Sequence, residues 1–494
     1  MLFQSTRSGL TANALEAVLE GIAPDGGLYV DPSLPSRAFD VEKCLGLSEL
    51  GMAEMLLSFL LPGFEDMGAL TRRAYSGKFE NECISPLVKC GDMWISELFH
   101  GPTSAFKDVA LSVLPQLISS ARGGMGINEE TVILTATSGD TGKAALEGFH
   151  DVPGTGIIVF YPDGGVSSVQ RAQMVTQAGR NVRVCAVRGN FDDCQRGVKE
   201  AFAAVDAAKY AKRLSSANSI NIGRLAPQLI YYFSAYAQLM SAGEIAYGEP
   251  VDFIVPTGNF GDILAGYFCK LLGLPVGRLV CAANENNVLC DFILTGCYDA
   301  RRKFMRTSSP SMDILVSSNL ERLLYYVSEG DTEKVGAWMT SLKNDGVYRV
   351  DERVHARLRS CFSAGFADEA ATKRTIARVW NEHKYLCDPH TAVAVSVAED
   401  YRHGADYGGN KCVVLSTASP YKFPAAVLSA IAPDAPRGDE FALLRTLQDI
   451  TDLPIPKNLA ALADMPVLHT DVIDKNGITD YVTEILRNGG FEKP

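Results

Sequence analysis

The chain has 494 residues, of which 47% are hydrophobic and 21% are charged, as is typical of an ordered globular protein of about two to four domains. Its formal net charge is −12 and no long run of Lys or Arg offsets it, which argues against nucleic acid as the main partner. No apolar run approaches the roughly 18–20 residues that span a bilayer, and residues 1–9 lack the apolar core of a signal peptide. We therefore expect a cytoplasmic protein without a membrane partner. The cysteines form no CxxC pair, so we interpret them as reduced thiols and expect no metal site.

The first part of the chain, residues 1–83, is predicted to be a mostly helical unit. Apolar residues recur at helical spacing over 12–22, a Pro-Asp-Gly-Gly turn and a short strand at 28–30 follow, and a second helix is expected over 47–61. From residue 84 to 225 the pattern changes to short apolar strands that alternate with helices. The expected strands are 94–95, 132–136, 156–161 and 182–187. Two helices are expected to start at 106 and 142, and two more are expected over 168–177 and 192–208.

A second alternating region covers residues 226–494. It contains strands at 253–255 and 278–283, a helical insertion at 312–378 with little strand, and a helix-rich tail from about residue 426. Alternation of strands and helices at this spacing predicts the α/β class, with two open, mostly parallel sheet domains. A ligand is expected in the cleft between them, at the carboxyl ends of the strands.

Lys107 lies in an unusual setting, between a Gly-Pro turn with a short run of small and apolar residues and an apolar helix. A lysine at a helix start is usually a solvated surface residue. A buried lysine must instead lose its proton or find a counter-charge, and its neutral amine can attack a carbonyl to form a Schiff base. Lys107 is therefore a candidate catalytic residue.

Two glycine-containing loops, each between a predicted strand and a predicted helix, are candidate anion sites. The first contains Ser138, Gly139, Asp140 and Thr141, where small residues leave the amides of a helix start free for an anion. It is not a P-loop, because Thr137 and Ala144 stand where Gly and Ser or Thr are required.

The second loop contains Gly258, Asn259, Phe260, Gly261 and Asp262, and its two glycines allow close approach of an anion to the backbone. An acidic Asp262 is compatible with an anion site if its carboxylate caps the helix. The similar segment 189–193 lacks the second glycine and carries two adjacent carboxylates, so we interpret it as a plain turn with an acidic N-cap.

The strand expected to end near residue 417 supplies hydroxyl groups at its carboxyl end, from Ser416 and Thr417. These would ordinarily be strand-end caps. A polar run at 215–224 contains Asn221 and Arg224, and Gln170 and Arg171 follow the strand that ends at Tyr161. All four are candidates for binding a substrate phosphate or carboxylate, together with residues 5–7.

Taken in this order, the segments resemble those of the threonine synthase family, pyridoxal-phosphate enzymes of the tryptophan-synthase-β fold type. The segment Pro102-Thr103-Ser104-Ala105-Phe106-Lys107-Asp108 is similar to the one that carries the cofactor lysine. Further matching segments lie at 5–7, 16–30, 191–195, 215–224, 388–392 and 422–423. Many relatives of the fold type have Ser-Gly-Asn-Thr in the first loop, where this chain has Ser-Gly-Asp-Thr at 138–141, as in the branch of bacterial and fungal threonine synthases.

The resemblance implies that pyridoxal 5'-phosphate is bound covalently by Lys107. It assigns the cofactor phosphate to Gly258, Asn259, Phe260, Gly261 and Asp262, and the pyridine nitrogen to Thr417, with Ser416 as the alternative. Ser138, Gly139, Asp140, Thr141, Arg171, Asn221 and Arg224 are expected to bind the substrate.

The activity implied is the conversion of O-phospho-L-homoserine and water to L-threonine and phosphate. A threonine or serine dehydratase and a non-catalytic binder of phosphorylated amino acids remain as alternatives. The resemblance is compatible with a monomer.

Overall fold

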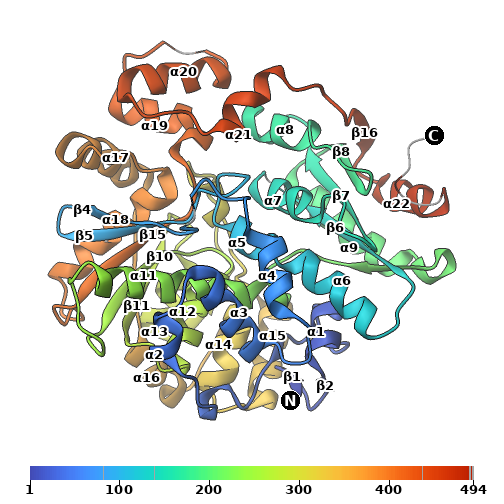
Figure 1. Ribbon diagram of the computed structural model, residues 1–494, viewed down its shortest axis with the longest axis horizontal. Helices are drawn as coiled ribbons and strands as arrows, with labels where there is room; N and C mark the ends of the chain where they lie inside the picture. The colour runs from blue at the N-terminus through green and yellow to red at the C-terminus, as the bar shows by residue number, and fades with distance from the viewer. Residues whose placement is uncertain (82, 138, 437, 489–490, 492–494) are drawn as a thin grey trace.

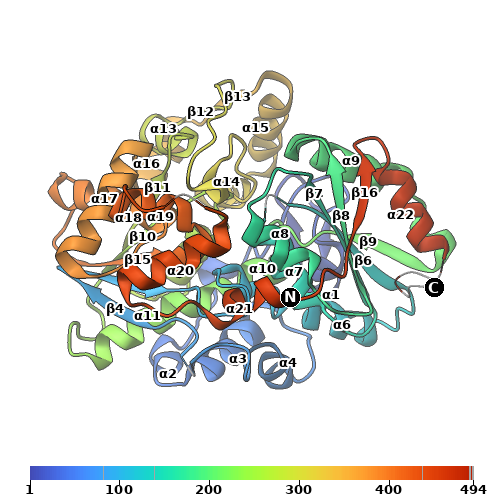
Figure 2. The same ribbon diagram turned by 90° about the horizontal axis from the view of Figure 1, so that it is seen from above.

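The computed structural model describes residues 1–81, 83–137, 139–436, 438–488 and 491. Two mainly parallel β-sheets lie side by side, each flanked by helices (Figures 1 and 2). The α/β class with two mostly parallel sheets is thereby confirmed. None of the helices within the described ranges is long and apolar enough to cross a membrane.

The larger sheet has six strands in the order β14-β11-β10-β15-β5-β4, and only β4 runs antiparallel to its neighbour. Its strands are β4 (Leu87–Cys90), β5 (Met93–Glu97), β10 (Val251–Pro256), β11 (Val276–Ala283), β14 (Phe362–Phe366) and β15 (Lys411–Ser416).

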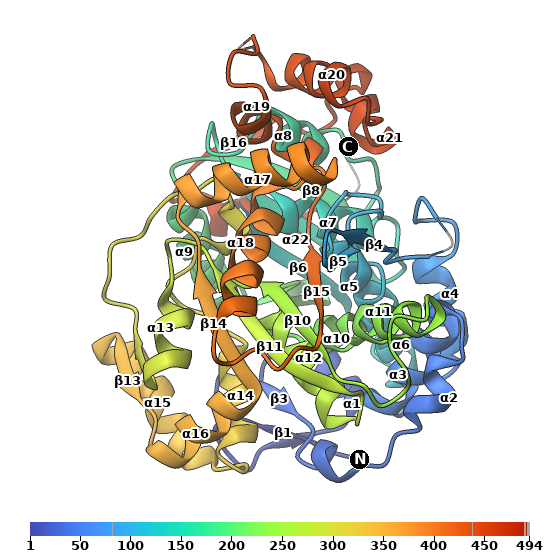
Figure 3. The same cartoon turned by 90° about the vertical axis from the view of Figure 1, so that its left-hand side faces the viewer.

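Helices cover both faces of this sheet, as the side chains of β10 show. Phe253 and Val255 belong to the hydrophobic cluster that includes α11 (Leu229–Ser241) and α12 (Gly261–Leu271). Ile254 belongs to a second cluster with α18 (Pro389–His403), which lies across the sheet in Figure 3. Because successive residues of a strand face opposite sides, α12 and α18 lie on opposite faces.

The smaller sheet has five parallel strands in the order β16-β8-β7-β6-β9. All residues of β7 (Thr155–Pro162) are buried, which explains why its sequence reads as a continuous apolar run. The other strands are β6 (Glu130–Ala136), β8 (Val182–Arg188), β9 (Lys212–Ser215) and β16 (Asp471–Asp474). Its helices are α6 (Leu114–Gly124), α7 (Asp140–Phe149), α8 (Ser168–Val175), α9 (Phe191–Ala204) and α22 (Ile478–Arg487).

The order of the strands in the sheets differs from their order along the chain. β4 and β5 come before every strand of the smaller sheet in the sequence, yet β5 pairs with β15, the last strand of the larger sheet along the chain. Near the other end of the chain, β16 pairs with β8 of the smaller sheet. Three segments therefore connect the sheets: the one that carries Lys107, the one that leads from β9 to β10, and the tail that crosses to β16 in Figure 2. The division of the chain at residues 83 and 225 stays a proposal, and the sheets themselves extend across it.

The N-terminal unit contains the expected helices and a small antiparallel sheet, β2-β1-β3. The helix predicted at 12–22 is α1 (Ala14–Glu20), which Asn13 and Glu16 start with a capping box and Gly21 ends at a positive φ. The other elements are β1 (Phe3–Ser5), β2 (Thr11–Ala12), β3 (Tyr29–Val30), α2 (Val41–Leu45), α3 (Glu49–Leu60) and α4 (Met67–Tyr75).

The segment predicted as a helical insertion contributes helices and one strand to the larger sheet. Its helices are α14 (Leu320–Val327), α15 (Thr332–Asp345), α16 (Glu352–Cys361) and α17 (Glu369–His383). It also supplies β14 and β13 (Val347–Arg349), and β13 pairs with β12 (Cys297–Asp299). The remaining helices are α5 (Lys107–Leu111), α10 (Ile222–Leu225), α13 (Val288–Thr295), α19 (Pro424–Ile431), α20 (Glu440–Thr451) and α21 (Lys457–Ala460).

Candidate active site

Lys107 is the first residue of α5, and the end of β15 holds the segment that precedes it. The Phe106 amide donates to the Thr417 carbonyl at 2.9 Å, and Ala105 forms an antiparallel bridge with Ala418. Lys107 itself is buried, with 8% of its surface exposed. The backbone thus fixes the lysine next to the carboxyl end of a central strand of the larger sheet.

Two polar groups from distant parts of the chain, Ser311 and Asp140, contact the Lys107 amine, and Lys422 joins them through Asp140. We call these four residues the Lys107 cluster. Its Nζ donates to the Ser311 hydroxyl at 3.2 Å and lies 3.8 Å from Asp140 Oδ2. The Ser311 hydroxyl also donates to Asp140, at 3.3 Å. Asp140 in turn forms a 2.7 Å ion pair with Lys422, whose side chain is fully buried.

The electrostatic setting favours the reactive form of Lys107. Burial lowers the pKa of the Lys107 amine to about 8, against the opposing effect of Asp140. Burial alone would raise the pKa of Asp140, but Lys422 and Lys107 outweigh it and hold that pKa well below its usual range. A neutral amine is therefore accessible near physiological pH, next to a carboxylate that stays ionised.

The loop from Gly258 to Asp262 joins β10 to the start of α12, and its amides have no acceptor in the described part of the chain. Across the described residues, no atom accepts a hydrogen bond from the backbone amides of residues 258–263, and α12 has no side-chain cap. Phe260 adopts a φ of 61°, which is unusual for a residue other than glycine, and its buried ring packs against Phe362. Consecutive free amides at a helix start form a cradle for an anion such as a phosphate.

The other side of this loop is held by the segment that carries Ser311. Both the amide and the side chain of Asn319 donate to the Asn259 carbonyl, at 3.1 and 3.2 Å. A Cβ atom on Gly258 would lie only 2.7 Å from the Ser311 carbonyl oxygen. Only glycine allows this approach, so Gly258 brings the loop and the Lys107 cluster together through Ser311.

Asp262 does not have the predicted capping role. Its carboxyl is turned back toward α11, where Oδ1 accepts hydrogen bonds from Tyr231 at 2.6 Å and from Tyr232 at 3.2 Å. Its other oxygen is buried without a partner among the described residues. Burial raises the Asp262 pKa to about 7, so the group can stay neutral beside an anion. The expectation that the Asp262 carboxylate caps α12 is wrong, because α12 has no side-chain cap. The raised pKa of Asp262, rather than a capping role, reduces the expected repulsion between its carboxyl and an anion.

The hydroxyls of Ser416 and Thr417 have different environments. Ser416 Oγ lies 2.8 Å from the Thr391 hydroxyl and is committed to that contact. The Thr417 side chain is buried, and it makes no hydrogen bond to any described residue. Thr417, rather than Ser416, therefore has a hydroxyl available for a ligand.

The sequence and structure are similar to those of known pyridoxal-phosphate enzymes. A family model described as pyridoxal-phosphate dependent enzyme matches residues 81–418, and another described as threonine synthase, C-terminal, matches residues 391–476. Threonine synthase of Pseudomonas aeruginosa is 39% identical over 445 residues, which cover 88% of this chain and 92% of that protein. The chain belongs to the threonine synthase family of pyridoxal-phosphate-dependent enzymes.

Solved structures of the family have the same fold. The crystal structure of threonine synthase from Brucella melitensis, with pyridoxal phosphate bound, superimposes with a TM-score of 0.87 at 36% identity and covers 99% of both chains. The structure of the yeast threonine synthase gives a TM-score of 0.88 at 32% identity. The human protein threonine synthase-like 1 is 37% identical over 440 residues, but this chain spans only 58% of its length.

The residues present fit the cofactor of this family. Lys107 offers an amine with a lowered pKa, the amides of residues 258–263 offer donors without acceptors, and Thr417 offers a free hydroxyl. These are the groups that a pyridoxal phosphate requires for its aldehyde carbon, its phosphate and its ring nitrogen. The roles assigned to Gly258, Asn259, Phe260, Gly261, Asp262 and Thr417 stay predictions that this donor set supports.

The first predicted loop is only partly described, because Ser138 lies outside the described residues. Gly139 has a φ of 139°, and a Cβ there would lie 2.4 Å from the Gln170 side chain. The Thr137 hydroxyl accepts hydrogen bonds from the amides of Gly139 and Gly142, which shapes the start of α7. Asp140 lies in the Lys107 cluster, and the next residue, Thr141, is half-buried.

The other candidates for substrate binding differ in how free their side chains are. Arg224 is buried, and burial lowers its pKa to about 10. Within the described chain, its side chain makes one hydrogen bond, to the Ala217 carbonyl. Asn221 caps α10 and donates to the Val18 carbonyl, so its amide group already has partners. Arg171 is exposed and contacts the Tyr161 hydroxyl.

The N-terminal candidates are held by carboxylates. Arg7 forms two 2.8 Å hydrogen bonds with Glu321, and Thr6 donates to the same carboxylate. Ser5 donates to Asp25. These side chains connect the N-terminus to α14 and to the neighbouring turn.

Ser311, Asn319 and Lys422 were not assigned a role from the sequence. Ser311 and Asn319 lie at or next to a segment that was interpreted only as a helical insertion. Lys422 and His390 lie in segments that match the family, yet nothing in their spacing shows their contacts. The His390 ring accepts a hydrogen bond from the Ser311 amide at 3.3 Å, and its other nitrogen lies 2.6 Å from Asp388.

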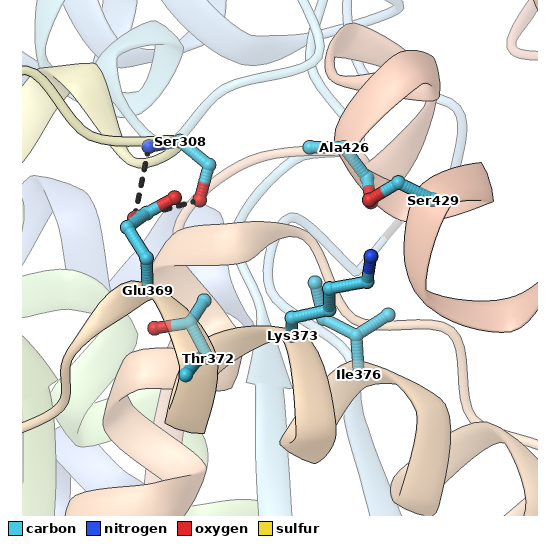
Figure 4. Close-up of a pocket in the computed structure, with 8 residues that line it drawn as sticks. Ser308, Glu369, Thr372, Lys373, Ile376, Ala426 and Ser429 are labelled. Atoms are coloured by element: carbon cyan, nitrogen blue, oxygen red, sulfur yellow. Dashed lines mark hydrogen bonds between the residues drawn. The ribbon is translucent and has the colours of Figure 1, made fainter. Parts of the chain in front are cut away.

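A cavity of about 300 Å³ lies near this site but does not contain Lys107 (Figure 4). It is formed between α17 and α19, with Lys373 extending toward Ala426 and Ser429. On one side, Glu369 accepts hydrogen bonds from the amide and hydroxyl of Ser308, at 3.0 and 3.1 Å. Since Ser308 is close in sequence to Ser311, this contact anchors the segment that reaches Lys107.

Proposed function

We propose that the protein is a threonine synthase, which converts O-phospho-L-homoserine and water to L-threonine and phosphate. The proposal is supported by the links between its groups: Lys107 contacts Ser311, the Ser311 backbone lies against Gly258 of the loop with free amides, and the residue before Lys107 is hydrogen-bonded to Thr417. Membership of the threonine synthase family supports the choice of reaction. In this reaction the enzyme is a lyase that acts on a phosphate ester.

The cofactor, when bound, supplies an electron sink for carbanions that form on the substrate. Lys107 would hold the cofactor in the resting enzyme, and its Nζ would be released when the substrate binds. Its freed Nζ then moves protons at Cα and Cβ of the substrate. An amine whose pKa is about 8 is suited to both steps, because it accepts and returns a proton near neutral pH.

The substrate carries a second phosphate, which needs donors separate from the 258–263 amides. Arg224 is suited to this role, because it is buried and no described carboxylate pairs with it. An unpaired buried guanidinium is costly, and an anionic ligand would offset that cost. Asn221, Arg171 and the loop from Ser138 to Thr141 complete the proposed substrate site.

The arrangement around Lys107 favours catalysis over mere binding. A protein that only binds phosphorylated amino acids has no need of a buried lysine with a lowered pKa beside a fixed carboxylate. A dehydratase would use the same cofactor groups, and the products distinguish it. We also expect a monomer, which light scattering on the purified protein would check.

The test is to incubate the purified enzyme, loaded with pyridoxal phosphate, with O-phospho-L-homoserine and to quantify L-threonine, phosphate and 2-oxobutyrate. We expect threonine and phosphate in equal amounts. A predominance of 2-oxobutyrate would instead identify a dehydratase. Binding of the substrate without any product would identify a silent relative.

A further inference from the structure

Lys422 is a buried cation that the proposed reaction does not use. Its side chain is fully buried, in the turn between β15 and α19. Its ammonium donates to the Thr103 carbonyl at 3.0 Å and pairs with Asp140 Oδ1 at 2.7 Å. A lysine is rarely buried to this extent unless a specific contact compensates for the lost hydration.

Asp140 lies between two lysines and connects them. Its Oδ1 faces Lys422 and also accepts from the Gln170 side chain at 3.1 Å, while its Oδ2 faces Lys107 and Ser311. Removing either lysine would leave this carboxylate with one cation instead of two. The charge of Asp140, and how strongly Asp140 stabilises a proton on the Lys107 nitrogen, therefore depend on Lys422, which does not itself contact Lys107.

Other charged groups near the cluster do not replace Lys422. Arg224 and Asp108 also act on the Lys107 amine, but more weakly than Asp140 and Lys422. The Asp108 carboxylate accepts from the amide and hydroxyl of Thr103, at 2.8 and 2.5 Å, on the far side of that residue. His390 lies near Asp140 and is oriented by Asp388.

We propose that Lys422 is a positioning residue, which fixes Asp140 as a carboxylate beside Lys107 and at the same time keeps the nitrogen of Lys107 from being over-stabilised in its protonated form. The two effects oppose each other at that nitrogen. Asp140 favours a proton on it, and Lys422 disfavours one by repulsion and by sharing the carboxylate. This inference rests on the proposed function, because it concerns the nitrogen by which Lys107 holds the cofactor.

The test is a pH titration of the visible absorption of the lysine-bound cofactor in the holoenzyme, since the absorption changes when the linking nitrogen loses its proton. We expect Lys422→Met to raise the midpoint by about one pH unit and Asp140→Asn to lower it by a similar amount. The double variant should return close to the wild-type midpoint, and Lys422→Arg should retain it because the charge is kept. An unchanged midpoint in Lys422→Met, with only a lower melting temperature, would reduce Lys422 to a structural ion pair and overturn the proposal.

Lys422→Met could fail to fold because the buried Asp140 carboxylate loses one of its two cations, and a double variant keeps the test decisive in that case. Removing both charges avoids that cost. The midpoint of Asp140→Asn with Lys422→Met should then lie above that of Asp140→Asn alone, and equal midpoints would refute the proposed repulsion. A wild-type protein that takes up no pyridoxal phosphate would defeat the proposed function instead, whereas normal threonine formation with unmoved midpoints would defeat only the role of Lys422.

Discussion

Two turns of this molecule share the letters Gly-Asn-Phe between a parallel strand and a helix, yet they differ in how the helix start is satisfied. At residues 189–193, Asn190 caps α9 by accepting from the Asp193 amide at 2.9 Å, and Asp193 accepts from the Asn190 amide at 3.1 Å. At residues 258–262, no side chain caps α12, and Phe260 takes the capping position with a positive φ. The predicted acidic N-cap of the first turn is thus wrong in detail, since Asn190 is the cap and Asp193 is the third residue of the helix.

The difference shows how one sequence pattern serves either structure or binding. In the first turn, the amides of Asn190 and Asp193 are each satisfied by the other residue's side chain, and the adjacent carboxylates of Asp192 and Asp193 would repel an anion. In the second, Asp262 is drawn away toward Tyr231 and Tyr232, and the amides stay free. Of the two glycines in the second turn, Gly258 is the one that space requires, because a Cβ at Gly261 would make only ordinary contacts with Asn319 and Ser219.

The largest expected effect comes from removing Lys107, the residue proposed to bind the cofactor whose phosphate is assigned to the second turn. Lys107→Ala should abolish the visible absorption of the lysine-bound cofactor and reduce turnover by several orders of magnitude, because both attachment and proton transfer depend on its Nζ. Absorption spectra of the purified variant and product analysis measure this. Retention of the visible band would show that another amine holds the cofactor.

Gly258→Ala tests the close approach that distinguishes the second turn. The added Cβ would lie 2.7 Å from the Ser311 carbonyl, a backbone atom that cannot move without disturbing the Lys107 cluster. Overpacking of this kind costs about 1–3 kcal/mol, so we expect the affinity for pyridoxal phosphate to fall about tenfold or more.

The matched control for this change is Gly189→Ala in the first turn. There the added Cβ would meet the Asp193 carboxylate at 2.9 Å, and that group is the end of a side chain that can shift. The control should lose some thermal stability and keep its cofactor affinity. Equal losses of affinity in both variants would mean that the two turns were assigned the wrong roles.

The comparison also shows which parts of the site follow from sequence. The strand–loop–helix pattern at 258–262, the helix start at Lys107 and the hydroxyls at the end of β15 are local, so their spacing predicts them. Contacts between distant segments are not local: Ser311 reaches Lys107 from a position just before the predicted helical insertion, and Lys422 reaches Asp140 through the interior. The same limit applies to the fold, where the pairing of β14 with β11 and of β16 with β8 depends on packing between remote segments.

A smaller effect is expected at the end of β15, where two adjacent hydroxyls differ in their partners. Thr417→Val should leave the cofactor attached but alter its absorption and lower kcat/KM by about tenfold, because one hydrogen bond to the ring is lost. Ser416→Ala is the control, since it removes the contact to Thr391 and should lower thermal stability without changing the spectrum. Unchanged spectra and kinetics in Thr417→Val would remove Thr417 from the site.

Asp262→Asn examines why an acidic residue is tolerated at the second turn. An unfolded aspartate ionises near pH 3.8, whereas Asp262 in the folded protein keeps its proton up to a pKa of about 7. Between these values the folded state binds the extra proton, so stability falls as the pH rises and the full cost is present above pH 7. The asparagine variant lacks this dependence, and its melting temperature should exceed that of the wild type by roughly 1–3 °C at pH 8 while the difference vanishes near pH 4. A difference that does not vary with pH would show that Asp262 is already ionised in the folded protein.

The smallest effect is expected from Asp193→Asn, because we expect the first turn to bind no anion. The Asn190 amide and then the Arg196 guanidinium hold the Asp193 pKa below its usual value, so its ionised form contributes stability above the unfolded pKa. That contribution is lost as the pH falls through the lowered pKa, and the small difference in melting temperature between variant and wild type should disappear there. The affinity for pyridoxal phosphate should remain within about twofold of the wild type at any pH, as for a surface change remote from a site. Fluorescence titration with the cofactor measures it, and a large loss of affinity would place the phosphate at the first turn rather than the second.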